Sequence, residues 1–594
     1  METRTLADIF FTSVGFNLDH HVTFKRPEGW QIISSRQYYG YVVALARALE
    51  QWGLQRGDRV AIISENRPEW MIADFACVCS GLADVPVYAT LTAEQTCYLL
   101  QNSGARVAVV STLAQAKKVQ SIQAKTAVEK IVVMDQVAEV NLIPLWSILN
   151  GASTEPDQAF NDRAHRIQPG DLATLIYTSG TTGVSKGVML SHGNLTSNTV
   201  VDVEHTGFIK GDLYLSFLPL AHVTARHLDY VCFFHGVTIS YCPNFDQLPQ
   251  MFREAQPTII VAVPRVYEKT RQEIERRAAF GFKRRILKWA ERVGARHQNE
   301  VSQGVTPSSL SWKLAERLVY SKVRAPFGGR SRAYYSGGAP LGHDMAEWFC
   351  RMGMPILEGY GLTETSPVLS VNRTGGFKIG SVGKVIDNVE VKIADDGEIL
   401  AKGPSIFGGY WNLPEESQAA FTSDGWFKTG DIGQIDSEGF LYITDRKKDL
   451  IKTSGGKFIA PQPIENSLKA NVLVAQAALI GDRRKYASVI ISPHFPLLED
   501  WAHANGVSFR SHSELVGNAK VRELYRGIIE DTNKRLAQFE TIKKILIVPD
   551  EFTVATGEIT PTLKLKRRII ETKYKEQIDE LYEGPHPLET APVG

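Results

Sequence analysis

The pattern of hydrophobic and polar positions in residues 35–150 alternates between two periods. RVAIIS (59–64) and RVAVVS (106–111) are short β-branched runs of the kind found in buried strands. YGYVVALARALEQWGL (39–54) and EWMIADFACVCSGL (69–82) carry apolar residues at helical spacing. Helices that alternate with buried strands predict a parallel α/β sheet.

The same alternation returns later in the chain. LYLSFLP (213–219), VTISYC (237–242) and TIIVAVP (258–264) are again short runs rich in β-branched or aromatic residues. We therefore expect a second α/β subdomain, stacked on the first.

The sequence pattern then changes to short strands separated by Gly and Asp turns, as in VEVKIADDGEILAKG and GFLYITDR. This pattern predicts a small β-subdomain over about 375–447. Mixed helices and strands follow from Lys448 onward. The predicted fold class is α/β: a large N-terminal domain (1–447) of two stacked α/β subdomains plus the β-subdomain, and a smaller, mobile α+β C-terminal domain (448–594).

The segment LIYTSGTTGVSKGVMLSH (175–192) has the composition of a phosphate-binding loop without the Walker spacing. Counted from Gly180, the positions that the Walker pattern reserves for Gly and for Ser/Thr hold Ser185 and Gly187. The flanking runs LATLIY and GVML are typical of strands, so the loop joins two strands and opens no helix.

Phosphate binding in such a loop depends on backbone N–H groups, hydroxyl groups and one ammonium group. The candidates are Thr178, Ser179, Gly180, Thr181, Thr182, Gly183 and Lys186. A solvated Gly/Thr/Ser hairpin is the alternative interpretation.

Composition and charge narrow the function classes. The 594 residues include 66 Lys and Arg against 65 Asp and Glu, so no global charge favours a nucleic-acid partner. The six cysteines lack metal-ligand spacing, which favours buried thiols in a reducing compartment. METRTLADIFF does not resemble a signal peptide, and no uncharged apolar run approaches the roughly 20 residues that span a bilayer. We expect a cytoplasmic protein, and the sequence favours no particular oligomeric state.

Five further motifs follow the loop in order. They are YYSGGAPL (334–341), EGYGLTET (358–365), GWFKTGD (425–431), DRKKDLIKTSGGKFIAP (445–461) and GEITPTLKLKRR (557–568). With YTSGTTGVSKGV, they resemble the motifs of the adenylate-forming superfamily, which includes AMP-binding acyl-CoA synthetases, luciferases and adenylation domains. The resemblance covers residues 30 to 585. LPLAH, VPRVYEK and TPTLKLKR look most like the long-chain fatty acyl-CoA synthetases.

The resemblance implies a two-step reaction with ATP, Mg²⁺ and coenzyme A. A fatty acid carboxylate attacks the α-phosphorus of ATP, giving acyl-AMP and pyrophosphate, and the thiol of coenzyme A then displaces AMP. The alternatives are an acyl-AMP ligase that passes the acyl group to a carrier protein, and a coenzyme A ligase for aromatic or short-chain acids. A lipid-binding scaffold with a decayed site is a third, disfavoured by the intact motif residues.

The resemblance also implies roles for residues of the phosphate, magnesium and nucleotide motifs. Residues 178–183 and Lys186 hold the β and γ phosphates, Glu364 and Thr178 are the Mg²⁺ ligands, and Thr363 contacts the α-phosphate. The adenine lies between Tyr360 and a flat glycine-rich wall. That wall and its neighbourhood comprise Gly337, Gly338, Ala339 and Gly361. Asp431 accepts hydrogen bonds from the ribose, assisted by Arg446.

Three further roles follow from the resemblance. Lys564 aligns with the adenylation lysine, with Lys566 as the alternative. Lys448 aligns with the hinge about which the C-terminal domain rotates. His222 is expected to line the acyl site.

Residues 266–330 form a strongly basic segment, with 15 Lys and Arg against six Asp and Glu. In FGFKRRILKWAERV, an apolar stripe of Phe282, Ile286, Trp289 and Val293 is expected beside basic residues. One interpretation is peripheral contact with an anionic membrane. The other is a helix packed on its own domain with a solvated basic face.

Overall fold

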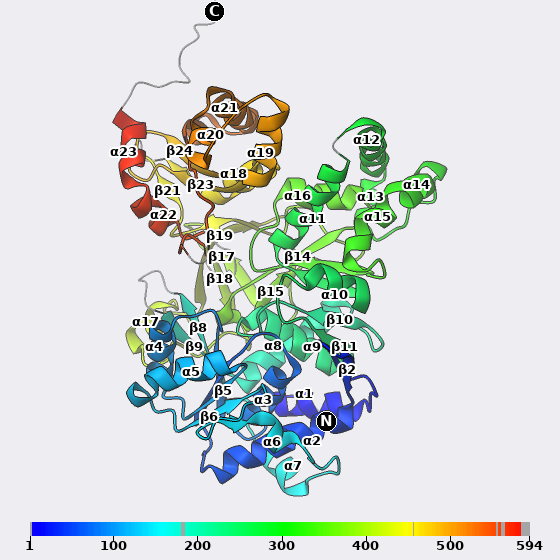
Figure 1. Ribbon diagram of the computed structural model, residues 1–594, viewed down its shortest axis with the longest axis vertical. Coiled ribbons are helices and arrows are strands. Elements are labelled where there is room, and N and C mark those ends of the chain that lie inside the picture. The colour runs from blue at the N-terminus through cyan, green and yellow to red at the C-terminus, as the bar shows by residue number, and fades with distance from the viewer. Residues whose placement is uncertain are drawn as a thin grey trace, which may run out of the picture.

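The computed structural model describes residues 3–179, 185–278, 280–454, 457–553, 556–559 and 565–583, apart from the side chains of residues 179, 202–206 and 458. Two large sheets form the lower and middle parts of the molecule, and a smaller C-terminal unit lies above them (Figure 1).

The first sheet has seven strands in the order β7-β6-β5-β3-β4-β8-β9, all parallel except the last pair. Its strands are β3 (Arg59–Ile63), β4 (Ala83–Val87), β5 (Val107–Val110), β6 (Lys130–Val133), β7 (Ile143–Pro144), β8 (Leu172–Ser179) and β9 (Ser185–Ser191). The helices of this part of the chain are α2 (Ser35–Gln51), α3 (Pro68–Val78), α4 (Ala93–Ser103), α5 (Leu113–Ile122), α6 (Leu145–Leu149) and α7 (Gln158–Ala164). The short β-branched runs are buried throughout, as strands covered on both faces require.

The second sheet has nine strands in the order β16-β15-β14-β13-β12-β10-β11-β1-β2. They are β1 (Val22–Arg26), β2 (Gly29–Ile33), β10 (Leu213–Ser216), β11 (Thr238–Tyr241), β12 (Ile259–Ala262), β13 (Ala333–Ser336), β14 (Ile356–Gly361), β15 (Val368–Val371) and β16 (Lys384–Val385). The associated helices are α1 (Leu6–Gly15), α8 (His192–Thr206), α9 (Val223–His235), α10 (Leu248–Ala255) and α16 (His343–Arg351). An antiparallel pair closes each edge, β1–β2 at one and β15–β16 at the other.

Between β12 and β13 the chain leaves the sheet and forms a helical lobe, at the upper right of Figure 1. Its helices are α11 (Pro264–Arg277), α12 (Gly281–Arg296), α13 (Gln298–Ser302), α14 (Leu310–Ala315) and α15 (Ser321–Arg324), with a π-helical turn at Glu316–Tyr320.

A four-stranded antiparallel sheet follows, in the order β17-β18-β19-β20. It comprises β17 (Glu390–Ile393), β18 (Glu398–Lys402), β19 (Phe427–Ile435) and β20 (Leu441–Arg446), with α17 (Pro414–Ala419) inserted before β19.

The C-terminal unit combines a two-stranded and a three-stranded sheet with helices. Its elements are β21 (Ile451–Lys452), β22 (Phe458–Ile459), α18 (Pro461–Lys469), β23 (Val474–Ile480), β24 (Ala487–Pro493), α19 (Phe495–Ala504), α20 (His512–Gly517), α21 (Ala519–Asn533), β25 (Ile542–Ile547), α22 (Arg567–Lys573) and α23 (Lys575–Glu583). It has its own buried cores, separate from the main one.

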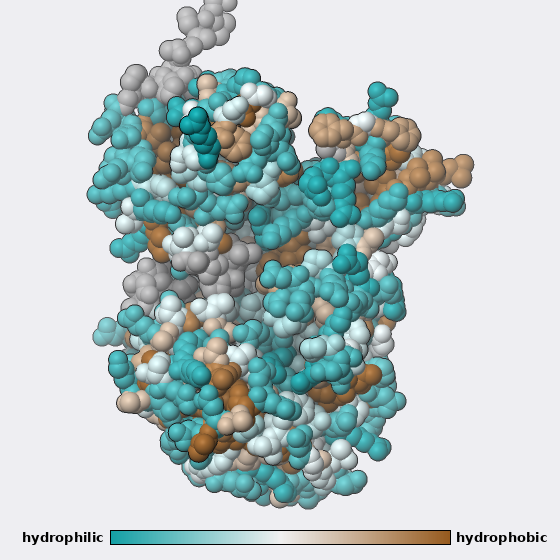
Figure 2. Space-filling view, viewed as in Figure 1, coloured by the Kyte–Doolittle hydropathy of each residue, from teal (hydrophilic) through white to brown (hydrophobic). Residues whose placement is uncertain are grey.

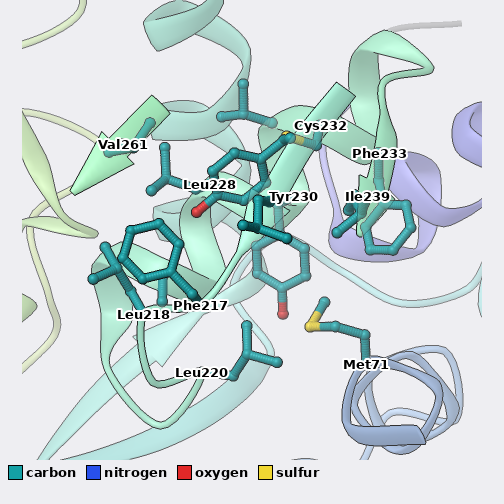
Figure 3. Packing of buried hydrophobic residues seen from close by; sticks show 14 of the residues in the cluster. Met71, Phe217, Leu218, Leu220, Leu228, Tyr230, Cys232, Phe233, Ile239 and Val261 are labelled. Carbon is teal, nitrogen blue, oxygen red and sulfur yellow. The ribbon is translucent and has the colours of Figure 1, made fainter. Parts of the chain in front are cut away.

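Helix α9 lies between the two large sheets and is buried nearly all round. On one side Arg226 bonds to Asp84 of the first sheet, and on the other Asp229 accepts a hydrogen bond from Tyr241 of the second at 2.8 Å. Figure 3 shows Tyr230 of the same helix pointing toward Met71 of α3. The core is therefore continuous between the sheets, and the residues of α9 have fixed positions.

The structure confirms the predicted α/β class, with a large N-terminal part and a smaller C-terminal unit. The loop after β8 joins two antiparallel strands, as its flanking sequence predicts. All six cysteines are buried and unpaired. In the described part of the chain, no helix is long and apolar enough to cross a membrane.

The apolar stripe predicted in FGFKRRILKWAERV is confirmed except at one position. In α12, Val293 is buried and Ile286 and Trp289 pack half-buried against the main core, beside the buried Leu287 and Ala290, whereas Phe282 is exposed. Contacts with α14 and α16 decide how far along the helix this face is covered, and the sequence of one helix does not specify its neighbours.

Candidate active site

Two adjoining cavities lie where α9 faces the ends of β12 and β13. Thr224, Val261, Gly337 and Gly338 line both of them. The first is otherwise lined mainly by apolar residues, and the second extends past Tyr360. A chain molecule in one cavity and a planar ring in the other would therefore share one wall.

Glycine occupies the positions near this wall for different physical reasons. Gly338 has φ of +79°, a conformation that favours glycine, and a Cβ atom on Gly337 would meet only Gly359 O, at 3.9 Å. At Gly361 a Cβ atom would lie 1.7 Å from Pro367 O. Gly361 is thus required by the close approach of β14 to the following segment, whatever it contributes to a ligand.

Tyr360, Asp431 and Arg446 form one connected group. The Tyr360 hydroxyl donates to Asp431 Oδ2 at 2.7 Å, and Arg446 Nε lies 3.3 Å from Asp431 Oδ1. Asp431 and Arg446 are directly opposite in the antiparallel pair β19–β20, so the pairing of these two consecutive strands brings their motifs together. Burial, followed by the Asp431 charge, raises the pKa of Tyr360, so its ring is held as a neutral phenol.

A second group joins Lys186, Tyr410 and Glu364. The Tyr410 hydroxyl donates to Glu364 Oε1 at 2.9 Å, and Lys186 Nζ lies 5.2 Å from the centroid of the Tyr410 ring. Burial raises the pKa of Glu364, while Tyr410 and the Arg446 charge act in the opposite direction. The Arg446 effect indicates that the two groups are close enough to share an electrostatic field.

Thr178 and Thr363 each lie beside one member of the second group. Thr178 is directly opposite Lys186 in the β8–β9 hairpin, so the two side chains share one face. Thr363 is buried and begins the 3-10 turn that carries Glu364. Hydroxyl, carboxylate and ammonium groups therefore converge from three separate segments.

Several predicted residues lie outside the described residues: Gly180, Thr181, Thr182, Gly183 and Lys564, together with the side chain of Ser179. The structure describes both ends of GEITPTLKLKRR (557–568), which carries Lys564 and which we call the lysine segment. There Ile559 and Leu565 pair as an antiparallel bridge, and Lys566 N donates to Glu558 O at 2.7 Å. Ala339 is exposed beside the cavity wall.

The start of α22 fixes the far end of the lysine segment. Arg567 pairs with Glu465 of α18 at 2.7 Å. Its charge also acts on Asp445, the residue before Arg446, although burial is the larger effect and raises the Asp445 pKa to about 7. The segment thus returns close to β20, on which Arg446 lies.

His222 lines the first cavity and also caps α9. Its Nδ1 accepts a hydrogen bond from Thr224 N at 3.2 Å. The residue therefore has a structural role in addition to its place at the cavity.

The residues before and after Lys448 are held by two different parts of the protein. Lys447 pairs with Asp396 and Glu398 of the four-stranded sheet, at 2.6 and 2.7 Å. Ile451, four residues after Lys447, is buried in the C-terminal core. The backbone between them is the covalent link between two separately packed units.

Three residues or groups near the site carry too little sequence signal to be predicted. The only local signal at Tyr410 is an aromatic residue after a pair of glycines. Glu358 is buried beneath the glycine wall, accepts from Leu341 N at 3.1 Å, and has a pKa raised by burial to about 7. Arg226 pairs with Asp74 of α3 and Asp84 of the first sheet, and we call these residues the Arg226 cluster. No local pattern predicts the cluster, because its members come from separate elements.

Family comparisons agree with this geometry. Residues 14–411 match the AMP-binding enzyme family, and residues 448–586 match its C-terminal domain. The chain belongs to the AMP-binding enzyme family.

Among its relatives, the protein named long-chain-fatty-acid–CoA ligase FadD15 in Mycobacterium bovis is 37% identical over 93% of this chain and 92% of its own length. The ligase of the same class named ACSBG2 in Xenopus laevis is 33% identical over 94% of this chain and 81% of its own. ATP-bound MatB from Rhodopseudomonas palustris has the same fold, with a TM-score of 0.70 at 24% identity over 96% of this chain and 99% of its own.

Proposed function

We propose that the protein is an ATP-dependent long-chain fatty acid–CoA ligase. It joins a fatty acid to AMP, releases pyrophosphate, and transfers the acyl group to coenzyme A with release of AMP. The observation that carries the proposal is the wall shared by the two cavities, because a carboxylate at the end of an acyl chain would there meet a bound nucleotide. The names and coverage of the relatives support the same substrate class.

In the proposed site, Asp431 and Arg446 bind the ribose and Tyr360 stacks on the adenine. The Tyr360–Asp431 hydrogen bond fixes the angle of the ring before the nucleotide arrives. Lys186, Thr178 and the glycine-rich loop hold the phosphates, and Thr363 contacts the α-phosphate. Preorganised donors of this kind stabilise the charge that develops as the carboxylate attacks phosphorus.

Mg²⁺ is proposed to bind Glu364 and Thr178. Carboxylate and hydroxyl oxygens suit this cation, which takes its other ligands from phosphates and water. Burial raises the pKa of Glu364, and a divalent cation beside it would favour the charged form. The donor set therefore fits the metal.

The first cavity is proposed to take the acyl chain near its carboxyl end. Leu218, Phe245, Val261 and Val263 offer apolar surface there. Each methylene transferred from water to such surface contributes about 0.8 kcal/mol, so long chains gain most.

The C-terminal domain is proposed to begin at Lys448 and to rotate about this residue between the two half-reactions. The anchoring of Lys447 on one side and Ile451 on the other supports that position for the hinge. An exposed ion pair, Arg535–Asp344 at 3.2 Å, also joins the two parts, and such pairs exchange at little cost.

The decisive experiment measures both half-reactions over a series of acids from acetate to palmitate, including benzoates. Fatty-acid-stimulated ATP–pyrophosphate exchange and coenzyme A thioester formation, both greatest for long chains, are expected. Exchange without thioester would indicate transfer to a carrier protein, and a preference for benzoates would indicate an aromatic acid ligase. Absence of exchange would contradict the enzyme assignment.

We also propose a cytoplasmic location with peripheral contact to the anionic face of a membrane, through the basic segment 266–330. A long-chain acid is held in membranes because water is a poor solvent for it.

A further inference from the structure

Exposed large hydrophobic side chains concentrate in the helical lobe. Among the described residues, six of the 14 such side chains lie between positions 280 and 318. Five of them form what we call the apolar tip: Phe280, Phe282, Leu310, Leu314 and Leu318. Figure 2 shows the brown patches at the outer end of this lobe, over α12 and α14.

Two features show that the exposure is built into the lobe. Phe280, Phe282 and Leu310 expose 85%, 75% and 84% of their surface. Leu310, Leu314 and Leu318 recur every four residues, so they share the outer face of α14 and of the turn after it, whereas Trp312 and Ala315 pack inward. An amphipathic helix normally buries its leucine face, and here that face is directed outward.

The charges beside the tip are of one sign. Lys283, Arg284, Arg285 and Lys288 of α12 are exposed, and none pairs with a carboxylate in the described part of the chain. Lys313, Arg317 and Lys322 continue the basic surface, again without a described acidic partner.

The preceding helix shows that this arrangement is local. In α11, Arg271 pairs with Glu275 at 2.9 Å, and Arg276 and Arg277 pair with Glu273. Most basic residues of α11 therefore pair with a carboxylate of the same helix, whereas the four basic residues of α12 named above do not.

The basic residues of α12 also lie at positions where they do not stabilise the helix. Lys283, Arg284 and Arg285 fall at its N-terminal end, where the helix dipole disfavours cations, and Phe280 at the N-cap position provides no capping hydrogen bond. Helix stability thus offers no reason for three cations and two exposed aromatic side chains at this end.

The tip is connected to the proposed acyl cavity by one element. Val261, Ala262 and Val263 line the cavity, α11 starts at Pro264, and Phe280 follows its end. Its 14 residues rise about 21 Å, at roughly 1.5 Å per residue.

We propose that the apolar tip and the basic residues beside it dock the protein on an anionic lipid bilayer. The Phe and Leu side chains enter the boundary between headgroups and acyl chains, and the Lys and Arg side chains contact lipid phosphates. The occupant is a lipid surface and not a second copy of this chain, because two copies would bring like-charged surfaces together. The inference deepens the proposed function, since it identifies where a ligase for membrane-held acids meets its supply.

The test is sedimentation with vesicles of phosphatidylcholine alone or of phosphatidylcholine with phosphatidylglycerol, without ATP, coenzyme A or fatty acid. Wild-type protein is expected to bind the anionic vesicles and to be released by salt. Phe280→Ser/Phe282→Ser and, separately, Lys283→Gln/Arg284→Gln/Arg285→Gln should each weaken partitioning roughly tenfold or more.

The matched controls lie on the C-terminal unit. Phe539→Ser removes another exposed Phe, and Lys485→Gln/Arg510→Gln/Lys575→Gln removes three exposed charges. Both should bind vesicles as the wild type does. All variants should retain ligase activity toward a water-soluble medium-chain acid, which shows that they are folded.

Three results would overturn the proposal: no binding of wild-type protein to anionic vesicles, unchanged binding of both tip variants, or equal losses in the controls. If light scattering shows a dimer that the tip variants break, a second copy covers the tip and the proposal is wrong. Because binding is measured without substrates, its failure is distinct from a failure of ligase activity.

Discussion

Tyr410 donates a hydrogen bond to Glu364 at 2.9 Å while its ring lies 5.2 Å from the ammonium group of Lys186. One aromatic residue thus positions the proposed metal ligand and the proposed phosphate-binding cation together. Tyr410 is held in this place by an isolated antiparallel bridge to Val188 of β9.

Tyr410→Phe should slow adenylation and change its pH dependence. A hydrogen bond to a charged group is worth about 1.5–3 kcal/mol, so a loss of roughly ten- to a hundredfold in rate is expected. The bond lowers the pKa of Glu364, which burial raises, so its removal raises that pKa further. Because the charged carboxylate is the active form, the acid limb of the pyrophosphate-exchange profile should move to higher pH.

Tyr442→Phe is the control for this change, since the Tyr442 hydroxyl contacts Asp436 on the outside of the β-subdomain at 3.3 Å. Its profile should match that of the wild type. A Tyr410→Phe profile that is lower at every pH without a shift would contradict the link to Glu364.

Glu364→Gln should weaken the productive use of Mg·ATP. The substitution keeps the shape of the side chain but removes the charge that a divalent cation requires. Titration of Mg²⁺ at fixed ATP should show a requirement for more metal, with partial recovery at high concentration. Glu415→Gln, at an exposed carboxylate of α17, should titrate as the wild type does. An unaltered Mg²⁺ titration for Glu364→Gln would remove the residue from the metal site.

Lys564→Ala should impair adenylation far more than thioester formation from supplied acyl-AMP. The proposed lysine acts only where carboxylate and α-phosphate meet, and loss of one such donor costs about 10²–10³ in rate. Lys566→Ala is the natural comparison, because its backbone is tied to Glu558 next to the lysine segment. If Lys566→Ala gives the selective loss, the neighbouring lysine is the catalyst. Equal losses in both half-reactions would contradict either assignment.

The Arg226 cluster predicts an effect on stability. Arg226 is almost fully buried and pairs with Asp74 and Asp84, and Tyr230 also donates to Asp74, at 2.8 Å. Arg226→Leu leaves buried carboxylates without their cation, at a cost of about 3–5 kcal/mol in unfolding free energy. Denaturant unfolding measures this, and Arg276→Leu, which breaks an exposed pair, should cost about 1 kcal/mol or less.

The same cluster gives a pH dependence with a definite sign. Burial raises the pKa of Asp74 and the Arg226 charge opposes that rise, so the variant should raise the pKa further. The folded variant then holds a proton that the unfolded chain releases, and its stability falls as pH rises. The deficit relative to wild type should be smallest in mildly acidic buffer. Addition of Asp74→Asn and Asp84→Asn should restore part of it, and a deficit independent of pH would contradict this account.

The sequence predicted those parts of the fold that follow from local pattern. β3, β5 and β12 are short β-branched runs, and each lies where its run predicts. The β8–β9 hairpin followed from strand patterns on both sides of the loop. Such elements carry their signal in consecutive residues, so neighbours in space are not needed to recognise them.

The missed features depend on contacts between distant segments. Tyr410 meets Glu364 across 46 positions, and Arg226 meets Asp74 across 152. In the helical lobe, the sequence predicted the packed face of α12 at Ile286, Trp289 and Val293 but not the exposure of Phe282, because the contacts with α14 and α16 decide how far along α12 that face is covered. The roles assigned to Lys564 and to residues 180–183 stay predictions from the family resemblance.

The last prediction concerns the link between the two domains. Lys447 is fixed to Asp396 and Glu398, and Ile451 is fixed in the C-terminal core, so any rotation must be taken up by the backbone between them. Proline restricts φ to about −65° and also limits the residue before it. Lys448→Pro should therefore hold the protein in one arrangement. We expect pyrophosphate exchange to continue, while thioester formation becomes far slower even from supplied acyl-AMP.

Lys448→Ala separates the backbone from the side chain in this experiment. It removes the ammonium group but leaves the dihedral angles free, so both half-reactions should stay close to wild type. Rapid-quench measurement of each half-reaction, on protein whose folding is checked by circular dichroism, decides the matter. Equal relative rates in both half-reactions of Lys448→Pro would exclude the hinge at this residue. A selective loss in Lys448→Ala would instead assign the effect to the lysine side chain, because alanine leaves the backbone free to rotate.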